Sequence, residues 1–465
     1  MTPHTATDER PTGETFALDE LRQVFDAGRT RPLRWRLEQL EAIEAMCTEQ
    51  EQAIAAALAA DLGRPPVEAW LGDIASTKGE AAYARKHLKK WMRRRRQPLP
   101  LAQLPARGWV QYDPLGSVLV IGPWNYPFYL SVGPLVAAVA AGNCAVLKPS
   151  ELAPATSALL AELIPKYLDG EAIRVVEGDA DTTQSLIGQG FDHVLFTGGT
   201  EIGRKIMAAA APTLTPVTLE LGGKSPVIVA ADADLDVAAR RVAWVKLMNS
   251  GQTCIAPDYV LAERTVVDSF AAKVVENIAA FRAQESDKGQ RIVNERQFDR
   301  LRGLIESTSG TILTGGLCDA QSLRIEPTVI RDPAPNDSVM ADEIFGPILP
   351  ILSVESTKDA VAFVNSRPKP LALYVFTESG SLGRQLVDAI PSGGAVINHV
   401  AMHCLVPQLP FGGVGASGIG QYHGRWGFEA LSHRRAVLAK SAKPDLKLTY
   451  PPYTDGAIKL MRKLF

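Results

Sequence analysis

The sequence predicts an α/β fold built on a parallel, doubly wound sheet, with a second α/β domain after it. At 465 residues, the chain is too long for one ordinary hydrophobic core, so two or three domains are expected. From residue 116 onwards, short apolar runs alternate with helical segments, which is the pattern of parallel strands covered by helices. In such a fold, ligands bind at the carboxyl ends of the strands.

The N-terminal region differs from the rest of the chain. Residues 1–15 are polar and are predicted to be disordered, whereas residues 16–96 have the Ala- and Leu-rich periodicity of helices. A cationic run at residues 89–96 ends this zone before Pro98. It could be read as a nucleic-acid contact. We prefer a helix C-terminus and a solvated face, because both positions favour cations.

The alternation that follows assigns individual elements. The predicted strands are residues 117–121, 144–147, 172–176, 193–196 and 217–221. The predicted helices are residues 128–141, 155–168, 181–189 and 200–210. Residues 226–395 repeat the alternation less regularly and are predicted to form the second domain, and the part from Pro410 is glycine-rich and then basic.

Composition argues against several classes of protein. Apolar residues make up 46% and charged residues 22%, as in a soluble globular protein. A net charge of −2 gives no general case for nucleic acid or membrane binding. The five cysteines form no CxxC pair and no cluster with metal-ligand spacing, so we expect no metal, and a sparse odd set suits a reducing compartment. Neither a signal peptide nor a transmembrane helix is predicted, and the expected location is the cytoplasm.

Cys254 is the sharpest candidate for chemistry. It follows a predicted amphipathic helix with Asp234 as its N-cap and Gly251 as its stop. A cysteine that is partly thiolate can attack a carbonyl carbon. Glu220 closes an apolar run before two glycines and is a candidate base. The alternative for Cys254 is a buried, inert thiol, which is how we interpret the other four cysteines.

Three further sites follow predicted strands. The turn from Gly198 to Gly203 starts a helix, where backbone N–H groups bind phosphate, although a turn without a ligand fits almost as well. Lys148 and Glu151 could bind ribose hydroxyls or form a solvated surface pair. Asn125 offers an uncharged amide donor for an oxyanion, or an Asx-type turn.

Together these segments resemble the aldehyde dehydrogenase superfamily over residues 15–440. The motifs that carry the resemblance are Gly122-Pro-Trp-Asn-Tyr-Pro127, Lys148-Pro-Ser-Glu151, Phe196-Thr-Gly-Gly-Thr-Glu-Ile-Gly203, Leu219-Glu-Leu-Gly-Gly-Lys-Ser-Pro226, Asn249-Ser-Gly-Gln-Thr-Cys254, Glu343-Ile-Phe-Gly-Pro347 and Pro410-Phe-Gly-Gly-Val-Gly-Ala-Ser-Gly418. The cysteine motif and His423-Gly-Arg-Trp-Gly-Phe428 are similar to the class 3 branch, which oxidises fatty, aromatic and coniferyl aldehydes.

The resemblance implies a role for each residue. Cys254 attacks the aldehyde, Asn125 holds the oxyanion, and Glu220 activates the water that hydrolyses the thioester. The residues implied at the NAD or NADP site are Trp124, Lys148, Glu151, Gly198, Gly199, Gly203, Gly223, Glu343 and Phe345. Tyr126 and His403 are implied in the substrate pocket. Gly199 stands where the superfamily often has serine, so a hydroxyl donor to phosphate is absent.

The resemblance also implies an aldehyde dehydrogenase-like fold with two Rossmann-like domains and a small bridging element. The implied boundaries are residues 16–221 for the dinucleotide-binding domain, with bridging strands near 100–114, and residues 222–396 for the catalytic domain. Residues 397–440 return to the first domain and the bridge, and residues 441–465 form a tail. We expect a homodimer acting on an apolar aldehyde. Two alternatives stay open: an enzyme that passes the acyl group to coenzyme A, and a non-catalytic structural relative.

Overall fold

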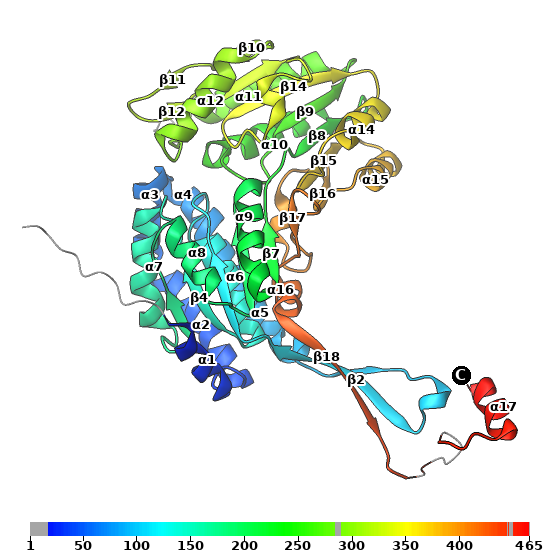
Figure 1. Ribbon diagram of the computed structural model, residues 1–465. Helices are drawn as coiled ribbons and strands as arrows, with labels where there is room; N and C mark the ends of the chain where they lie inside the picture. Colours follow the sequence, from blue (N-terminus) through cyan, green and yellow to red (C-terminus); the bar gives the residue numbers. More distant parts are fainter. Residues whose placement is uncertain (1–16, 284–289, 444, 446–449, 465) are drawn as a thin grey trace, which may run out of the picture.

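Two parallel sheets and one protruding antiparallel sheet organise the protein (Figure 1). The computed structural model describes residues 17–283, 290–443, 445 and 450–464. The expectation of disorder for residues 1–15 therefore lies outside the described residues. The mixed α/β class and the alternation of strands and helices are confirmed.

The first sheet has six strands in the order β17-β7-β6-β3-β4-β5. The strands are β3 (Ser117–Ile121), β4 (Cys144–Lys148), β5 (Ile173–Val175), β6 (His193–Thr197), β7 (Val217–Glu220) and the short antiparallel β17 (Gly418–Ile419). Every residue of β3, β4 and β6 is buried, which explains why their sequences are continuous apolar runs rather than alternating ones.

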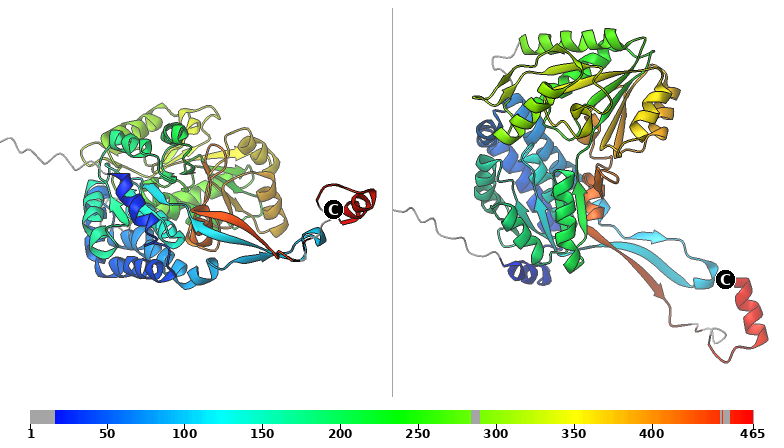
Figure 2. Two further views of the ribbon diagram at one scale, coloured as in Figure 1. Left: turned by 60° about the horizontal axis from the view of Figure 1, so that its bottom comes forward. Right: turned by 45° about the horizontal axis from the view of Figure 1, so that its top comes forward.

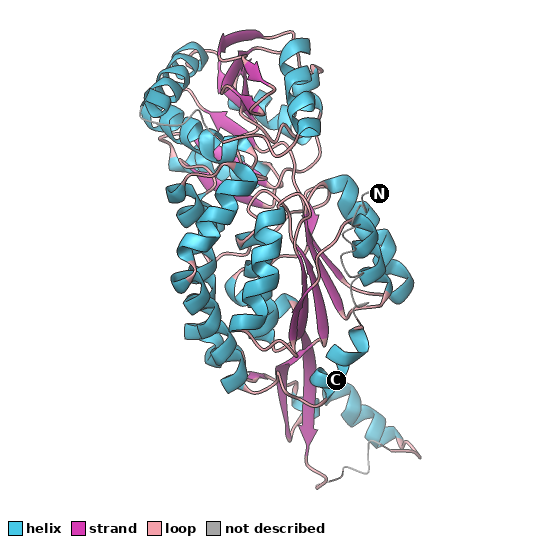
Figure 3. Ribbon diagram, turned by 90° about the vertical axis from the view of Figure 1, so that its left-hand side faces the viewer, coloured by secondary structure: helices cyan, strands magenta, loops and turns pink. Residues whose placement is uncertain are grey.

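Helices lie on either side of this sheet (Figure 3). They are α6 (Tyr129–Ala141), α7 (Pro154–Tyr167), α8 (Ala180–Gly188), α9 (Thr200–Ala210) and α16 (Gly424–Ala430). The N-terminal helices are α1 (Leu18–Asp26), α2 (Leu33–Glu49), α3 (Glu51–Leu62), α4 (Pro66–Ala69) and α5 (Ala75–Trp91), with a π-helical turn at Trp70–Ile74 before α5. The helical prediction for residues 16–96 was wrong at its end, because Arg95 and Arg96 belong to a strand.

The second sheet has seven strands in the order β10-β13-β14-β9-β8-β15-β16 and is parallel except for β10. The strands are β8 (Pro226–Val229), β9 (Tyr259–Glu263), β10 (Thr311–Thr314), β13 (Thr328–Arg331), β14 (Ile348–Val354), β15 (Ala372–Phe376) and β16 (Gly394–Ile397). The helices are α10 (Leu235–Leu247), α11 (Val267–Ala283), α12 (Glu295–Ser307), α13 (Ser338–Ala341), α14 (Thr357–Asn365) and α15 (Gly380–Ala389). A small hairpin joins β11 (Cys318–Asp319) to β12 (Arg324–Ile325).

The third sheet, which we call the arm, projects from the body in both views of Figure 2. It consists of β1 (Arg95–Gln97), β2 (Ala106–Pro114) and β18 (Ser432–Lys440). Strands β2 and β18 pair over nine residues, from Ser432 opposite Pro114 to Lys440 opposite Ala106. Helix α17 (Asp455–Leu464) lies near the tip of the arm (Figure 1). In the part of the chain that the structure describes, no helix is both long and apolar enough to cross a membrane.

Candidate active site

Cys254 and Glu220 line one cavity between the two parallel sheets. The cavity has a volume of about 180 Å³, and its other walls are mostly apolar. Glu220 is the last residue of β7, so its side chain stands at the carboxyl end of a strand, where this architecture places its ligands. Cys254 follows α10, which the Asp234 carboxylate caps by accepting a hydrogen bond of 3.0 Å from Val237 N–H, as the sequence predicts.

The loop before Cys254 has an unusual backbone. Helix α10 ends at Leu247 rather than at Gly251, and Asn249 and Ser250 then adopt φ angles of 51° and 50°. Gly251 has φ +70°, and a Cβ there would lie 2.2 Å from the carbonyl oxygen of Gly346. Three consecutive left-handed residues turn the chain sharply, and such strain typically marks a functional site.

Hydrogen bonds hold this strained loop to the segment that contains Asn125. The Asn125 side-chain amide donates to the Gln252 carbonyl at 3.1 Å, and the Asn249 amide donates to the Asn125 and Gln252 carbonyls at 2.9 Å each. The Gln252 amide in turn donates to the carbonyls of Asn249 and Arg291 at 3.0 and 3.1 Å. Asn125 is buried beside the cysteine loop, one N–H of its amide is engaged, and it is not among the residues that line the cavity.

Burial dominates the electrostatics of the two reactive groups. Glu220 is 3% exposed, and among the described residues neither of its carboxylate oxygens has a hydrogen-bond partner. Desolvation raises the pKa of Glu220 well above its usual range. Burial, and then the nearby carboxylate of Glu343, likewise raise the pKa of the Cys254 thiol. Each group therefore favours its protonated form until a partner or ligand changes its surroundings.

Arg64 supports the site, although sequence reasoning did not find it. The fully buried Arg64 guanidinium pairs with Asp73, donates to the Asn125 carbonyl and lies 4.4 Å from the centre of the Tyr126 ring. Tyr126 lines the cavity, and its hydroxyl lies 3.0 Å from the Thr253 hydroxyl oxygen. Nothing in the sequence around Arg64 signals this role, because its partners come from distant segments.

His403 is one of the two residues implied in the substrate pocket. It is not among the residues that line the cavity, whereas its neighbours Met402, Cys404 and Leu405 are. Its ring packs behind the wall against Tyr374 and Phe411, with ring centres 6.4 and 5.7 Å apart. Burial lowers the pKa of His403 to about 4, so the ring is neutral. The implied place of His403 in the substrate pocket therefore stays a prediction, and the contacts observed for its ring are with Tyr374 and Phe411.

Residues implied at the adenosine end of the cofactor site form an ion pair. Lys148 ends β4, is 3% exposed, and its ammonium group lies 2.6 Å from the Glu151 carboxylate. Glu151 is about half exposed, so the pair stands at the surface edge of the sheet rather than inside it. An ammonium and a carboxylate in this position match the donor and acceptor needs of ribose hydroxyls.

The residues at the nicotinamide end cluster around the Glu343 carboxylate. A Cβ at Gly222 would lie 2.0 Å from the Glu343 carboxylate oxygen, and Gly223 N–H donates a hydrogen bond to the same carboxylate. Burial, and then the charge of Asp258, raise the pKa of Glu343 to about 8. Phe345 and Trp124 meet edge to face with ring centres 5.3 Å apart. The position of the Glu343 carboxylate therefore requires a glycine at residue 222, which sequence reasoning did not select.

The glycines of the turn before α9 have different roles. A Cβ at Gly198 would lie 2.4 Å from the Phe196 ring, and one at Gly203 would lie 2.6 Å from the Leu221 side chain, so either would force a neighbouring side chain to move. A Cβ at Gly199 would meet nothing within 4 Å, and this residue precedes α9 without a side-chain cap. The open helix N-terminus at Gly199 is the part of the turn that fits a phosphate.

A buried amine lies near the same end of the site. Lys246, in the last turn of α10, is 2% exposed, and its ammonium nitrogen has no hydrogen-bond partner among the described residues. Burial lowers its pKa to about 8, while the charges of Asp258 and Glu343 oppose this change. Sequence reasoning did not select Lys246, although a lysine that interrupts an otherwise apolar helix face is a signal that could have identified it.

Comparisons with known proteins agree with this geometry. The sequence profile described as "Aldehyde dehydrogenase family" matches residues 15–437. The chain is 46% identical to rat "Aldehyde dehydrogenase family 3 member A2" over 95% of this chain and 92% of that protein. It is 44% identical to rat "Aldehyde dehydrogenase, dimeric NADP-preferring" over 93% of this chain and 96% of that one. The structure titled "Substrate bound state of Staphylococcus Aureus AldH" superposes with a TM-score of 0.93 at 39% identity, over 96% and 98% of the two chains.

Proposed function

The chain belongs to the aldehyde dehydrogenase family and oxidises aldehydes with NAD or NADP, and we propose that Cys254 and Glu220 perform the chemistry by a thioester route. The observation that carries the proposal is that a cysteine and a buried carboxylate line one apolar cavity, and that this carboxylate has no hydrogen-bond partner among the described residues. An aldehyde bound there has a nucleophile and a base within the same walls.

The proposed reaction begins at the Cys254 sulfur. The thiol first loses its proton to solvent, and the thiolate then attacks the aldehyde carbon. A C–S bond forms and the carbonyl oxygen becomes an oxyanion, which accepts hydrogen bonds from the Asn125 amide and the Cys254 N–H. Loss of hydride from that carbon gives a thioester. Glu220 then takes a proton from water as the water attacks the thioester, the C–S bond breaks, and the carboxylic acid leaves. The raised pKa makes Glu220 a strong base in its ionised form, so it acts in the fraction of enzyme in which it has lost its proton.

The residues at the carboxyl ends of the strands fit a dinucleotide. Lys148 and Glu151 would bind the adenosine ribose, the N–H groups at Gly199 the pyrophosphate, and Glu343 the nicotinamide ribose. When bound, the dinucleotide supplies the acceptor for the hydride. We propose that residues 16–221 form the dinucleotide-binding domain and residues 222–396 the catalytic domain. Residues 397–440 would return to the first domain and the bridge.

A rapid-mixing experiment tests the two catalytic roles. Glu220→Gln should still form the acyl-enzyme, so a burst of NADH should precede a steady state slowed by about 100- to 10,000-fold. Cys254→Ala should bind the dinucleotide but show neither burst nor turnover. A Glu220→Gln variant with an unchanged steady state would contradict the role of the carboxylate. Restoration of Glu220→Gln turnover by coenzyme A would favour the acyl-transfer alternative. Normal turnover of Cys254→Ala would show that Cys254 is not the nucleophile.

The apolar cavity supports an aliphatic or aromatic aldehyde as the substrate. Leu130, Ile255 and Phe411 line it together with Tyr126, so polar substrates would lose hydration without gaining partners. A panel of aldehydes of increasing chain length tests this: kcat/KM should rise with apolar surface. Equal kcat/KM for short polar aldehydes would contradict it.

We further propose that the arm docks on a second copy of the chain. Strand β18 lies at one edge of the arm, where a second copy could pair with it, and Leu438 on this strand is 53% exposed. The rat relative described as dimeric supports a dimer. The cytoplasmic location stays a prediction from the sequence.

A further inference from the structure

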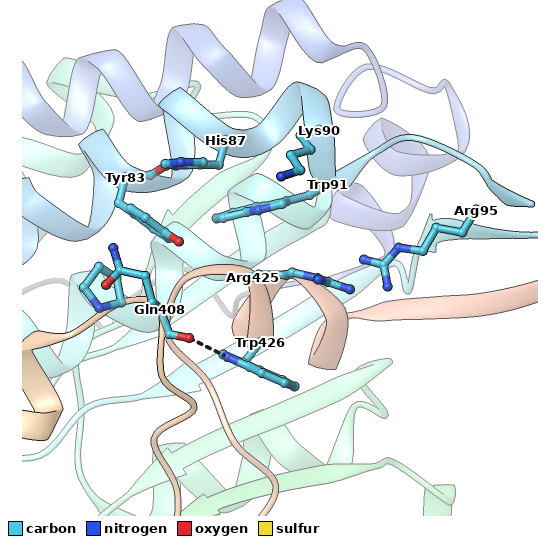
Figure 4. Close-up of a pocket in the computed structure, with 9 residues that line it drawn as sticks. Tyr83, His87, Lys90, Trp91, Arg95, Gln408, Arg425 and Trp426 are labelled. Atoms are coloured by element: carbon cyan, nitrogen blue, oxygen red, sulfur yellow. Dashed lines mark hydrogen bonds between the residues drawn. The ribbon is translucent and has the colours of Figure 1, made fainter.

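A second cavity, of about 400 Å³, lies outside the proposed catalytic site (Figure 4). It is formed where helix α5 faces α16 and the segment around Gln408. Its volume falls in the range of small-molecule pockets, about 300 to 1,000 Å³. Aromatic side chains make one part of its lining, and cationic side chains make another (Figure 4).

The aromatic part is built along one face of α5. Tyr83, His87 and Trp91 are spaced four residues apart, so they follow one another on the same side of the helix. The Tyr83 and His87 rings lie 4.3 Å apart, and the His87 and Trp91 rings are stacked at 16° with centres 6.2 Å apart. Across the cavity, Trp426 is 41% exposed and donates from its indole nitrogen to the Gln408 carbonyl at 3.2 Å. This ordered set of flat surfaces suits a flat apolar ligand.

The cationic part carries excess positive charge. Arg95 and Arg425 both bind the Glu429 carboxylate, at 2.8 and 2.5 Å. Burial alone would raise the pKa of Glu429, but the hydrogen bonds from Arg425 and Arg95 outweigh it and hold the pKa below its usual value. Glu429 is therefore ionised. Lys90 has no ion-pair partner among the described residues. Three cations thus face one carboxylate, and the positive charge left over favours a bound anion.

The second cavity and the substrate cavity are neighbours but share no lining residue. The same segments contribute to both. Helix α5 provides Ser76 to the substrate cavity and Tyr83 to the second cavity, and the later loop provides Leu405 to the first and Gln408 to the second. Between them, the buried Glu80 carboxylate accepts a hydrogen bond from Gly424 N–H. A ligand of the second cavity would therefore bind without displacing the aldehyde.

We propose that this second cavity is a binding site for a small monoanion with a flat apolar body, such as an aryl carboxylate. The carboxylate would meet Lys90 and Arg425, and the ring would lie against the Trp91 and Trp426 side of the cavity. A neutral molecule of the same shape would leave the cations without a partner, and a bare anion would leave the aromatic surfaces uncovered. The proposal does not rest on the chemistry of Cys254.

Isothermal titration calorimetry with 4-isopropylbenzoate tests the proposal on the full chain. Lys90→Gln should weaken binding about fivefold, because one charge-assisted contact is lost. Lys89→Gln is the matched control, since Lys89 lies on the same helix but does not line the cavity, and it should bind as the unmodified protein does. Trp426→Leu should also weaken binding, which separates the aromatic contribution from the charge.

Competition titrations give the outcomes that would overturn the proposal. The neutral 4-isopropylbenzyl alcohol and inorganic phosphate should each bind at least about tenfold more weakly than the carboxylate. Addition of an apolar aldehyde without dinucleotide should leave the carboxylate affinity unchanged. Displacement by the aldehyde would place the ligand in the substrate cavity instead. Equal affinity of Lys90→Gln and Lys89→Gln, or of phosphate and the carboxylate, would refute the site as described.

Discussion

Gly222→Ala should separate dinucleotide binding from protein stability. The new Cβ would lie 2.0 Å from a Glu343 carboxylate oxygen, which is inside any permitted contact, so Glu343 must move. The atom that moves is the end of a flexible side chain, and Gly222 does not have a positive φ, so the fold should tolerate the change. The proposed contact of Glu343 with the nicotinamide ribose is a hydrogen bond to a charged group. Its loss costs about 1.5 to 3 kcal/mol, or about 10- to 100-fold in KM for NAD and NADP.

Steady-state kinetics and thermal unfolding together check this prediction. The melting temperature should stay near that of the unmodified protein, as it should for the control Gly303→Ala, whose Cβ meets nothing within 4 Å. Gly251→Ala is the contrasting variant, because its Cβ would meet the Gly346 carbonyl at φ +70°, and it should lose about 1 to 3 kcal/mol of stability. Combining Gly222→Ala with Glu343→Asp shortens the carboxylate and should recover part of the KM. An unchanged KM in Gly222→Ala would refute the role given to Glu343.

Three further predictions concern cofactor choice, pH and assembly. Glu151→Gln should improve the KM for NADP several-fold and leave that for NAD nearly unchanged, because the carboxylate beside Lys148 would repel a 2′-phosphate; equal effects on both would show that Glu151 faces elsewhere. Burial raises the pKa of Glu220, so the rate of thioester hydrolysis should fall as pH falls through that raised value, and the fall should disappear in Glu220→Gln. Leu438→Glu on the arm should shift sedimentation toward the monomer, whereas Leu214→Glu, at an 89% exposed position outside the arm, should not; a dimer that survives Leu438→Glu would exclude this surface.

Local signals predicted the strands and the cap of the helix before Cys254. The apolar runs gave β3, β4 and β6 because strands buried on both faces need no alternation, and Asp234 could be recognised as a cap because its carboxylate has a local partner. The prediction that the helix extends to residue 96 was wrong because Arg95 pairs with Val110 on a neighbouring strand. Local propensity does not report such a contact.

Residues with distant partners were beyond sequence reasoning. Arg64 meets Asn125 across 61 positions of the chain, and the Gly222 requirement comes from Glu343, more than a hundred positions away. His403 sits in a segment whose neighbours line the cavity, and only the observed packing against Tyr374 separates it from them. Such assignments depend on which side of a turn faces the cavity, which spacing alone does not determine.

The strained loop links the cysteine motif at residues 249–254 to the motif at residues 343–347. The left-handed backbone conformation costs about 1 to 3 kcal/mol of folding free energy at Asn249 and again at Ser250. The loop therefore persists only where its surroundings hold it. Gly251 must be glycine because the Gly346 carbonyl lies where its Cβ would be, and Gly346 belongs to the segment that carries Glu343. The cysteine loop and the Glu343 segment therefore fix each other through backbone contact. A change that relaxes either one should move both the nucleophile and the cofactor contact, which is why Gly251→Ala should impair chemistry and dinucleotide binding together, whereas Gly222→Ala should impair only the second.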